Sequence, residues 1–481
     1  MKFRDGFFLL LLTAGAFFLH GYHPYTEDAA IYVPAIEKAL QPALFPRGAE
    51  FFESHGGLTL FPQLMAASAR VLHLPLETML LVWHVLCLFL FLLGCWQVAR
   101  ACFEAPEARW ASVGLVAALL TLPAGASAML LMDQYVGPRS FSSIASVFAV
   151  ALALRERYLG AVVLLAASGL IHPMMPVYAL FFVGLLVWNR RREGRAAAVA
   201  ALLPFENLFQ APTPAYHQAS LHHSFHYIWR WSGYEWAGVF APIALFVWFG
   251  RIARRSGMAN AARLCGALVP FLWCALGAAV VLDTPARFEA LARFQPMRSL
   301  HLAYILMFLL LGGMLGKFVL RREVWRWLLL FVPVCAGAAL IQLRMYPASA
   351  HVEWPGAPSR NEWVQAFRWV RANTPQNAYF ALDPDYLDRP GEDRDSFRAI
   401  AERSSLAELI KDSGAVSMFP SLAEEWREQV EAEKGWTNFQ AADFHRLQQR
   451  YGVNWVVLQQ PGAAGLSCPY QNQSVRVCRV E

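Results

Sequence analysis

Two adjacent carboxylates, Glu27 and Asp28, follow directly on the first apolar segment of the chain. Ionisable residues close to a membrane interior are costly to keep there and are therefore functional candidates. In one interpretation, Asp28 is a general base that deprotonates an acceptor hydroxyl, and Glu27 assists or orients it. In the other, the pair marks a helix start, where acidic side chains stabilise the positive end of the helix dipole. The residues alone leave both interpretations open.

Two arginines could bind an anion on the same side of the membrane. Arg139 lies in "MDQYVGPRSFS" (132–142) and Arg298 in "ARFQPMRSLH" (292–301), each at the start of an apolar segment. A guanidinium is a rigid fork that suits a phosphate and keeps its charge when partly buried. The alternative is that each side chain extends to ordinary lipid headgroups.

Histidines could bind a substrate or a metal ion. His172 stands before Pro173 at the end of an apolar segment, where it either donates a hydrogen bond into a cavity or is a satisfied structural residue. His222 and His226 have the i, i+4 spacing of zinc ligands on a helix. The glutamate of H-E-x-x-H is missing and no third ligand is obvious, so the plainer interpretation places both among tryptophans at the membrane interface.

The C-terminal part holds two further patterns. Asp383 and Asp385 formally match a D-x-D metal motif, but charge runs are usually solvated surface, and the glycine and glutamate of a calcium-binding loop are missing. Cys468 and Cys478 bracket a turn-like stretch. An oxidising compartment would permit a disulfide between them, although their spacing alone does not prove it.

Apolar segments dominate the chain that carries these residues. Its 481 residues are 57% hydrophobic and only 16% charged, whereas soluble domains have about 25% charged residues. Because a span needs about 20 mainly apolar residues, the pattern predicts a polytopic α-helical membrane protein with about 11 transmembrane helices. They are expected at 6–20, 76–99, 110–128, 140–154, 158–171, 174–188, 195–206, 236–250, 262–282, 299–317 and 326–343.

The distribution of lysine and arginine indicates on which side the loops lie. One set of loops holds most of them, including "RRREGR" (190–195), "RIARRSGMANAAR" (251–263) and "KFVLRREVWR" (317–326). Loops rich in lysine and arginine usually stay in the cytoplasm. The N-terminus, with Lys2 and Arg4, belongs to this set and is therefore predicted to be cytoplasmic. An odd number of spans then sends 345–481 to the periplasm of a bacterial inner membrane. The net charge of +6 reflects this topology, so no nucleic acid partner is expected.

From about residue 350 the pattern becomes that of a small α/β domain. "NEWVQAFRWVRANTP" has apolar residues at helical spacing, and "AYFAL" (378–382) and "VNWVVL" (453–458) are typical of buried strands. "SFRAIAERSSLAELIKDSG", "LAEEWREQVEAE" and "AADFHRLQQRYG" predict amphipathic helices. We therefore expect a transmembrane domain over 1–345, with a first outer loop at about 21–75, and a C-terminal extracytoplasmic α/β domain over 346–481.

The order of these features resembles the GT-C superfamily of membrane glycosyltransferases. The resemblance is carried by "YTEDAAIYVPAIEKAL" (25–40), "QYVGPRSFSS" (134–143), "GLIHPMMPVYAL" (169–180), "ARFQPMRSLHLAY" (292–304) and "WVRANTPQNAYFAL" (369–382). It implies an enzyme that transfers a sugar from a polyprenyl-phosphate donor to a glycan, lipid or protein acceptor at the extracytoplasmic face. It also implies direct inverting transfer, in which a carboxylate takes the proton of the acceptor hydroxyl while the lipid phosphate leaves.

The resemblance also implies roles for particular residues. The acidic residue that the family has in its first outer loop corresponds to Asp28, with Glu27 as the other candidate. The residues implied to bind the donor phosphate are Arg298 and Arg139. The candidates for the substrate cavity are Asp133, Tyr135, His172 and His222. Many members have a second acidic residue, sometimes a metal ligand, for which the candidates here are Asp133, Glu206 and Asp283. None of these matches a firm motif, so no cofactor is predicted and a divalent metal stays open.

A non-catalytic alternative remains at this point. A lipid- or glycan-binding membrane protein, or a transporter, could be built on the same scaffold, since one fold supports unrelated functions. A transporter should show paired broken helices in two repeated halves, but "IHPMMP" has no clear counterpart in the second half. No P-loop, no G-x-G-x-x-G that opens a helix after a strand and no G-x-S-x-G are present, and the cytoplasmic loops are too short for a nucleotide-binding domain. This argues against ATP-driven transport and against a cytosolic nucleotide-sugar enzyme.

Overall fold

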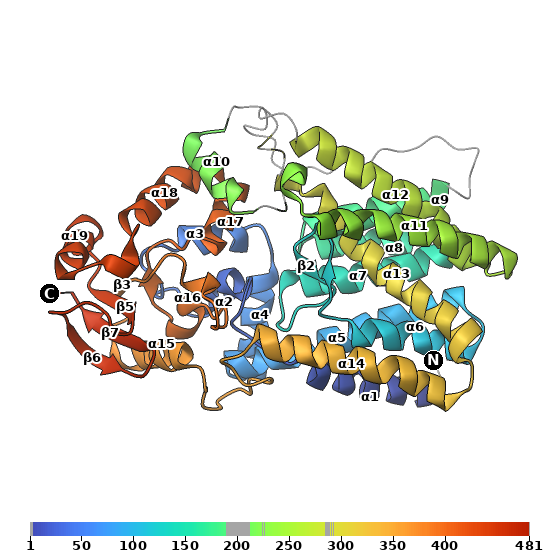
Figure 1. Ribbon diagram of the computed structural model, residues 1–481, viewed down its shortest axis with the longest axis horizontal. Coiled ribbons are helices and arrows are strands. Elements are labelled where there is room, and N and C mark those ends of the chain that lie inside the picture. Colours follow the sequence, from blue (N-terminus) through green and yellow to red (C-terminus); the bar gives the residue numbers. More distant parts are fainter. Residues whose placement is uncertain are drawn as a thin grey trace. The chain divides into compact units, whose positions relative to one another are not determined.

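The contacts of the computed structural model divide the chain into two compact units (Figure 1). The structure describes residues 3–188, 212–223, 225, 227–283, 289, 291 and 293–480. The first unit comprises Met1–Gly21, Val82–Pro212 and Ser224–Ile341. The second comprises Tyr22–Leu81, Thr213–His223 and Gln342–Glu481. The sequence-based boundary at 345/346 remains a prediction, whereas the contacts group the first outer loop with the C-terminal region.

Among the described residues, six helices are long and apolar enough to cross a membrane. They are Phe3–His20 (α1), Leu76–Cys102 (α5), Gly233–Arg255 (α11), Ala259–Leu282 within α12, Pro296–Leu320 including α13 (Leu300–Leu315), and Val324–Met345 (α14). Shorter apolar helices are Pro138–Leu154 (α7), Tyr158–Gly169 (α8) and Met174–Trp188 (α9). These helices match the predicted positions closely and give a polytopic membrane protein. The expected span 195–206 lies outside the described residues.

The span expected at 110–128 is wrong beyond its first half. Helix α6 covers Pro106–Ala118, and the chain then forms a small antiparallel hairpin of β1 (Pro123–Ala124) and β2 (Met129–Leu130). Pro123 has no N–H to continue a helix and disfavours helical backbone at the residue before it. A hydropathy average includes the apolar residues on both sides of this break and therefore overestimates the length of the helix.

Helices α6 and α13 of the first unit pack with their backbones in close approach. A Cβ atom at Gly312 of α13 would overlap the Ala111 carbonyl, and one at Gly316, directly after α13, would lie 2.6 Å from the Glu107 carbonyl oxygen. Ser112 of α6 donates a hydrogen bond of 2.8 Å to the Leu309 carbonyl of α13. Small residues and interhelical hydrogen bonds hold helices together in lipid. Apolar burial does not do so, because lipid tails are as apolar as the helix surface they replace.

The second unit contains a mixed five-stranded sheet in the order β4-β3-β5-β7-β6. Its strands are Tyr379–Ala381 (β3), Ser404–Ser405 (β4), Trp455–Gln459 (β5), Ser467–Gln471 (β6) and Val475–Arg479 (β7). β3 runs parallel to β4 and β5, and β7 runs antiparallel to β5 and β6. The helices of this region are Glu362–Asn373 (α15), Phe397–Ala401 (α16), Lys411–Met418 (α17), Ala423–Ala432 (α18) and Ala441–Tyr451 (α19). The predicted strands at 378–382 and 453–458 are confirmed.

The helix expected over "SFRAIAERSSLAELIKDSG" is wrong, because that stretch forms three elements. α16 ends at Ala401, and the residue that follows and caps it, Glu402, has a left-handed backbone with φ 50. Ser404 and Ser405 then pair with β3 as an edge strand, and α17 begins only at Lys411. The sheet therefore overrides a local pattern that is helical by itself.

Helices of the first outer loop complete the second unit. They are Ala29–Leu40 (α2), Glu50–Gly56 (α3) and Phe61–Leu72 (α4), and a further helix of the unit, α10, covers Pro214–Leu221. Phe51 of α3 is fully buried in one apolar core with Trp426 of α18 and Ala219 of α10. α2 packs against α16, and α3 against α17 (Figure 1). The loop after α1 is therefore part of one folded body with the C-terminal region.

Candidate functional site

Backbone hydrogen bonds hold the segment just before the acidic pair. The Tyr22 N–H donates to the His351 carbonyl at 3.1 Å, and the Glu353 N–H donates to the Tyr22 carbonyl at 3.0 Å. The Ser396 N–H donates to the Tyr25 carbonyl at 3.0 Å. Two stretches of the C-terminal region thus fix the backbone that leads into the carboxylates.

Glu27 and Asp28 lie at the start of α2. Glu27 has a left-handed backbone with φ 53, which costs a residue other than glycine on the order of 1–2 kcal/mol. Asp28 occupies the N-cap position of α2, yet its side chain forms no capping hydrogen bond. The pair therefore lies at a helix start, as the helix-dipole interpretation expects, but it adds no side-chain cap. The strained backbone at Glu27 is of a kind that tends to occur at functional sites.

Two basic side chains of the C-terminal region bind this pair. Lys411, the first residue of α17, donates from Nζ to Glu27 Oε2 at 2.7 Å and to Asp28 Oδ1 at 3.1 Å. Arg394 donates to Glu27 Oε1 at 2.9 Å and to Asp388 Oδ1 at 2.6 Å. The Asp28 side chain is 39% exposed and that of Lys411 only 13%. The Glu27 side chain is 32% exposed and is bonded to two basic residues, so the more exposed Asp28 is the carboxylate better placed to receive a proton from outside.

Opposite charges decide the protonation states of this cluster. Burial raises the pKa of Glu27, but Lys411 and Arg394 outweigh it and hold that pKa below its ordinary value. Burial lowers the pKa of Lys411, but Glu27 and Asp28 outweigh it and raise that pKa above its ordinary value. At neutral pH Glu27 is therefore a carboxylate and Lys411 an ammonium. This arrangement can orient Asp28 and keep its negative charge partnered.

The residues present at this cluster do not fit a divalent metal. A cation bound by both carboxylates would have to displace the Lys411 ammonium, which is already bonded to each of them. Across the part of the chain that the structure describes, no group of three or more His, Cys, Asp and Glu side chains is arranged to hold a metal ion. In the D-x-D stretch, Asp383 Oδ2 accepts a hydrogen bond of 2.7 Å from Arg389. In both places a basic side chain already binds a carboxylate that a metal ion would need.

Two candidates of the first unit, Asp133 and Arg139, are bonded to each other. Arg139 in the first turn of α7 donates from Nε to Asp133 Oδ2 at 3.0 Å and from Nη2 to Oδ1 at 2.5 Å. Both side chains are largely buried, with 13% of Arg139 and 6% of Asp133 exposed. A two-point bond fixes the plane of the guanidinium. Because this edge of Arg139 faces Asp133, its role toward a lipid phosphate stays a prediction.

Arg298 lies in a short 3-10 turn, η4 (Pro296–Ser299), that leads into α13. Its guanidinium carbon is 5.9 Å from the centre of the Phe225 ring. A small hollow there is lined by Ala126, Ser127, Phe225, Gln295, Pro296, Met297 and Arg298. His301 follows in α13, with Nε2 3.0 Å from the Leu131 carbonyl oxygen, and the charges of both Arg139 and Arg298 act on its ring. The first unit therefore gathers two arginines and a histidine near the N-terminal ends of α7 and α13.

The remaining candidates belong to different elements of the two units. His172 accepts a hydrogen bond of 3.4 Å from the Met175 N–H through Nδ1, at the start of α9, and Tyr135 is buried. His222 belongs to the second unit, at the end of α10, where its ring meets Trp426 edge to face at 5.8 Å. Their predicted place in a substrate cavity stays a prediction. His226 and Glu206 lie outside the described residues, and nothing is described of the Asp283 side chain.

Sequence reasoning missed Lys411 and Arg394. They are 384 and 367 positions from Glu27 along the chain, so no local pattern could reveal the contacts. Both residues stand among other charged side chains, Lys411 between Glu408 and Asp412 and Arg394 between Asp393 and Asp395, so in the sequence each looks like an ordinary surface residue. The cysteines at the C-terminus are closer in sequence, and Cys468 and Cys478 form a disulfide between β6 and β7.

Comparisons with known proteins return structural likenesses only. No family model matches the chain, and no curated protein matches it. Among solved structures, the chain is similar to the oligosaccharyltransferase of Archaeoglobus fulgidus in the apo form. It is equally similar to the archaeal oligosaccharyltransferase AglB from Archaeoglobus fulgidus in complex with an inhibitory peptide and a dolichol-phosphate. Each match has 13% identity and a TM-score of 0.46, and covers 95% of this chain and 70% of the other. At this TM-score the likeness carries no weight for function.

Proposed function

We propose that this chain is a GT-C-type glycosyltransferase that transfers a sugar from a polyprenyl-phosphate donor to an acceptor. It works at the extracytoplasmic face of a bacterial inner membrane, with about 11 transmembrane helices and a periplasmic C-terminal domain. The observation that supports this best is the cluster at the start of α2. There a strained Glu27 and a partly exposed Asp28 are both held by Lys411.

In the proposed reaction Asp28 is the general base. Its carboxylate takes the proton of the acceptor hydroxyl while that oxygen attacks the anomeric carbon of the donor sugar. The bond from that carbon to the lipid phosphate breaks, and the phosphate leaves with the electron pair. We assign the charge that develops on the phosphate to Arg298, with Arg139 as the second candidate. Lys411 and Glu27 act as positioning residues, because they orient Asp28 without touching the reacting atoms.

The test is Asp28→Asn in cells that lack the wild-type gene, with membrane insertion checked. Asn keeps the shape of the side chain but accepts no proton, so transfer should fall roughly a hundredfold or more. We expect loss of a glycan-modified product and accumulation of its lipid-linked donor, both measured by mass spectrometry. Asp388→Asn is the matched control, since Asp388 is an exposed carboxylate on the same Arg394.

The outcomes separate the proposal from its alternatives. If deletion of the gene changes a glycan but Asp28→Asn behaves as wild type, the proposed mechanism is wrong. If deletion leaves every glycan and glycolipid unchanged, a non-catalytic lipid- or glycan-binding protein, or a transporter, becomes the better description. Wild-type behaviour of Asp388→Asn beside a defective Asp28→Asn assigns the effect to Asp28 rather than to the net charge of the cluster.

A further inference from the structure

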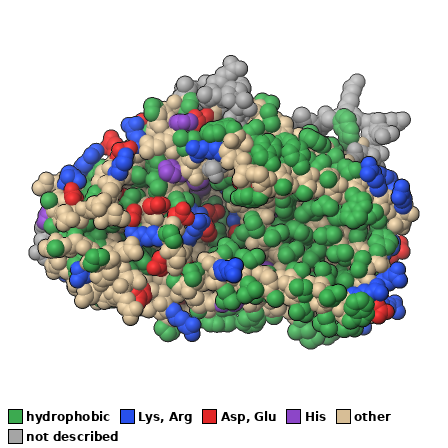
Figure 2. Space-filling view, in the orientation of Figure 1, with side chains coloured by type: hydrophobic (Ala, Val, Ile, Leu, Met, Phe, Trp, Pro, Cys, Tyr) green, Lys and Arg blue, Asp and Glu red, His purple; other side chains and the backbone are tan. Residues whose placement is uncertain are grey.

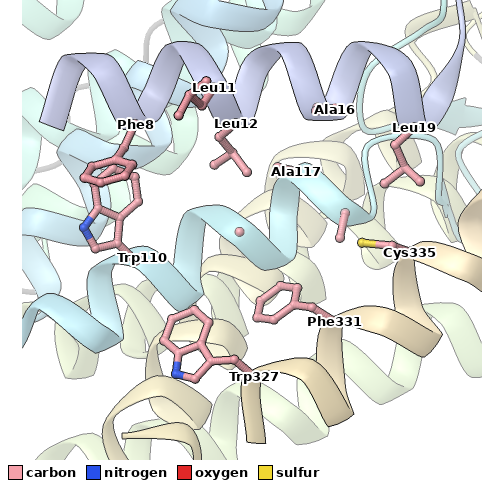
Figure 3. A pocket seen from close by; sticks show the side chains of 13 residues that line it. Phe8, Leu11, Leu12, Ala16, Leu19, Trp110, Ala117, Trp327, Phe331 and Cys335 are labelled. Atoms are coloured by element: carbon pink, nitrogen blue, oxygen red, sulfur yellow. The ribbon is translucent and has the colours of Figure 1, made fainter. Parts of the chain in front are cut away.

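An apolar groove of about 780 Å³ lies between α1, α6 and α14 of the first unit (Figure 3). Phe8, Leu12 and Leu19 of α1 face Trp327 and Phe331 of α14 across it. Glycine and alanine residues of α1 and α6 line much of the rest. None of the apolar window of α14 is buried, although this helix is long enough to span the membrane. Something apolar must therefore fill the space beside α14, because a groove without polar partners does not hold ordered water.

The lining of the groove and the charges near one end, rather than its volume, indicate the occupant. Five of the lining residues are glycine or alanine, namely Gly15, Ala16, Gly114, Ala117 and Ala118. A hydrocarbon chain is thin and can follow this strip of small residues. Van der Waals packing of this kind is what holds apolar groups in place within a bilayer.

One end of the groove is aromatic and basic. Phe8 and Trp110 pack edge to face at 5.8 Å, and Trp327 and Phe331 stack at 5.6 Å. Tryptophans gather where a membrane meets water, so this end is expected at headgroup level. Each helix carries an arginine at this end: Arg4 one turn before Phe8, Arg109 beside Trp110, and Arg326 beside Trp327. Figure 2 shows lysine and arginine side chains along the right-hand edge of the apolar surface.

Two of these arginines retain donors for a ligand. Arg109 uses Nε for a bond of 2.8 Å to the Phe103 carbonyl, and Arg326 uses Nη1 for one of 2.7 Å to the Val319 carbonyl. A guanidinium has five N–H donors, so further donors remain on each side chain. The three arginines flank residues that line the groove without lining it themselves. Their charge matches a negatively charged lipid headgroup at this end of the groove.

We propose that this groove binds an anionic phospholipid, with one acyl chain between α1, α6 and α14 and the phosphate against Arg4, Arg109 and Arg326. The lipid fills the groove beside the exposed apolar surface of α14 and holds this helix against α1 and α6. The site is independent of the proposed transfer reaction, because it shares no residue with the acidic cluster or with the Arg139 and Arg298 region.

The test uses purified full-length protein in a mild detergent. The protein is incubated with equal amounts of phosphatidylglycerol and phosphatidylcholine and repurified, and retained lipid is measured by mass spectrometry. Gly15→Leu should fill the groove, because the space around Gly15 is open. We expect retained lipid to fall roughly fivefold, which corresponds to about 1 kcal/mol of binding free energy. Gly277→Leu is the matched control, since Gly277 lies in α12, is equally open and does not line the groove.

The headgroup part is tested by a double variant, Arg4→Gln with Arg326→Gln. It should retain lipid but lose the preference for phosphatidylglycerol, while Arg251→Gln with Arg255→Gln, at the end of α11, should keep that preference. Unchanged lipid retention in Gly15→Leu overturns the proposal, as does recovery of an isoprenoid lipid instead of a phospholipid. A wild-type dimer that Gly15→Leu converts to a monomer overturns it in favour of a second copy. An unchanged preference in the arginine double variant overturns the headgroup assignment.

Discussion

At the scale of single residues, Lys411 is the side chain whose positive charge is bonded to both carboxylates of the acidic pair. It binds both carboxylates, and the charges on the two sides outweigh the cost of burial in each case. Glu27 has a depressed pKa, so its stabilisation is present above its unfolded pKa of about 4.3 and is lost as the pH falls through the folded value. Lys411 has a raised pKa, so its stabilisation is lost only as the pH rises above about 10. The pair is at full strength between these limits.

We therefore predict that Lys411→Met destabilises the protein at pH 7 and much less near pH 3. Removing one partner of a partly buried pair should lower the free energy of unfolding by about 1–2 kcal/mol at pH 7. Thermal unfolding in detergent at both pH values measures the difference. Arg427→Met, which breaks the exposed pair with Glu424, should have almost no effect at either pH. An equal loss at pH 3 and pH 7 would mean that Lys411 acts through packing alone.

A second residue-scale prediction concerns His23 and Glu353, which are bonded at 2.8 Å. Burial, followed by the charge of Asp393, raises the pKa of Glu353 to about 8. Burial lowers the pKa of His23 to about 3. At neutral pH the pair is therefore an uncharged carboxyl that donates to a neutral imidazole. Because the unfolded chain releases this proton near pH 4, the carboxyl costs stability increasingly as the pH rises from there to about 8.

Glu353→Gln should consequently make the protein more stable than the wild type at pH 8, and comparably stable at pH 4. Gln can still donate a hydrogen bond to His23, but it has no proton to lose. Unfolding temperatures across this pH range provide the measurement. A variant that is less stable than the wild type at pH 8 would show that Glu353 is ionised in the folded protein.

At the scale of elements, local patterns predicted what depends on neighbouring residues and failed where distant contacts decide. The helix at 362–373 follows from apolar spacing and ends before Pro375, and β5 follows from a run of β-branched and aromatic residues. The stretch 396–414 fails because β3 recruits Ser404 and Ser405 as an edge strand. In the same way, the acidic pair was recognised as a candidate from its position, whereas its binding to Lys411 depends on a contact that only the folded chain forms.

The contact of α6 with α13 gives a prediction at this scale. Gly312→Ala places a methyl group against the backbone of Ala111, which neither helix can avoid without moving apart. Overpacking of this kind typically costs about 1–3 kcal/mol. We expect a lower unfolding temperature and a lower yield of folded protein in detergent. Gly337→Ala in α14, where the added methyl group meets nothing, should behave as wild type. Equal behaviour of the two variants would show that the close approach of α6 and α13 does not contribute to stability.

At the scale of the whole molecule, the second unit is assembled from separate parts of the chain. Residues 22–81 carry the acidic pair, and their contacts lie largely with 342–481. Phe51 is buried beside Trp426, and Arg47 donates a hydrogen bond of 3.1 Å to the Tyr451 carbonyl. Sequence order suggests instead that the first outer loop belongs to the transmembrane domain. The two descriptions differ in what the loop needs in order to fold.

Removing residues 346–481 distinguishes them. If the C-terminal region supplies the core of the loop, the shortened chain should insert in the membrane but lose protection of residues 22–81. Loss of Phe51 burial alone removes about 1.5–3 kcal/mol of apolar stabilisation, and the bonds from Lys411 and Arg394 vanish with it. Limited proteolysis with mass spectrometry should therefore find new cleavage within 22–81, while helices α7 to α9 stay protected in both chains. Unchanged protection of 22–81 would instead support the division at 345/346, with the first loop folding on the transmembrane helices and the C-terminal region added to it.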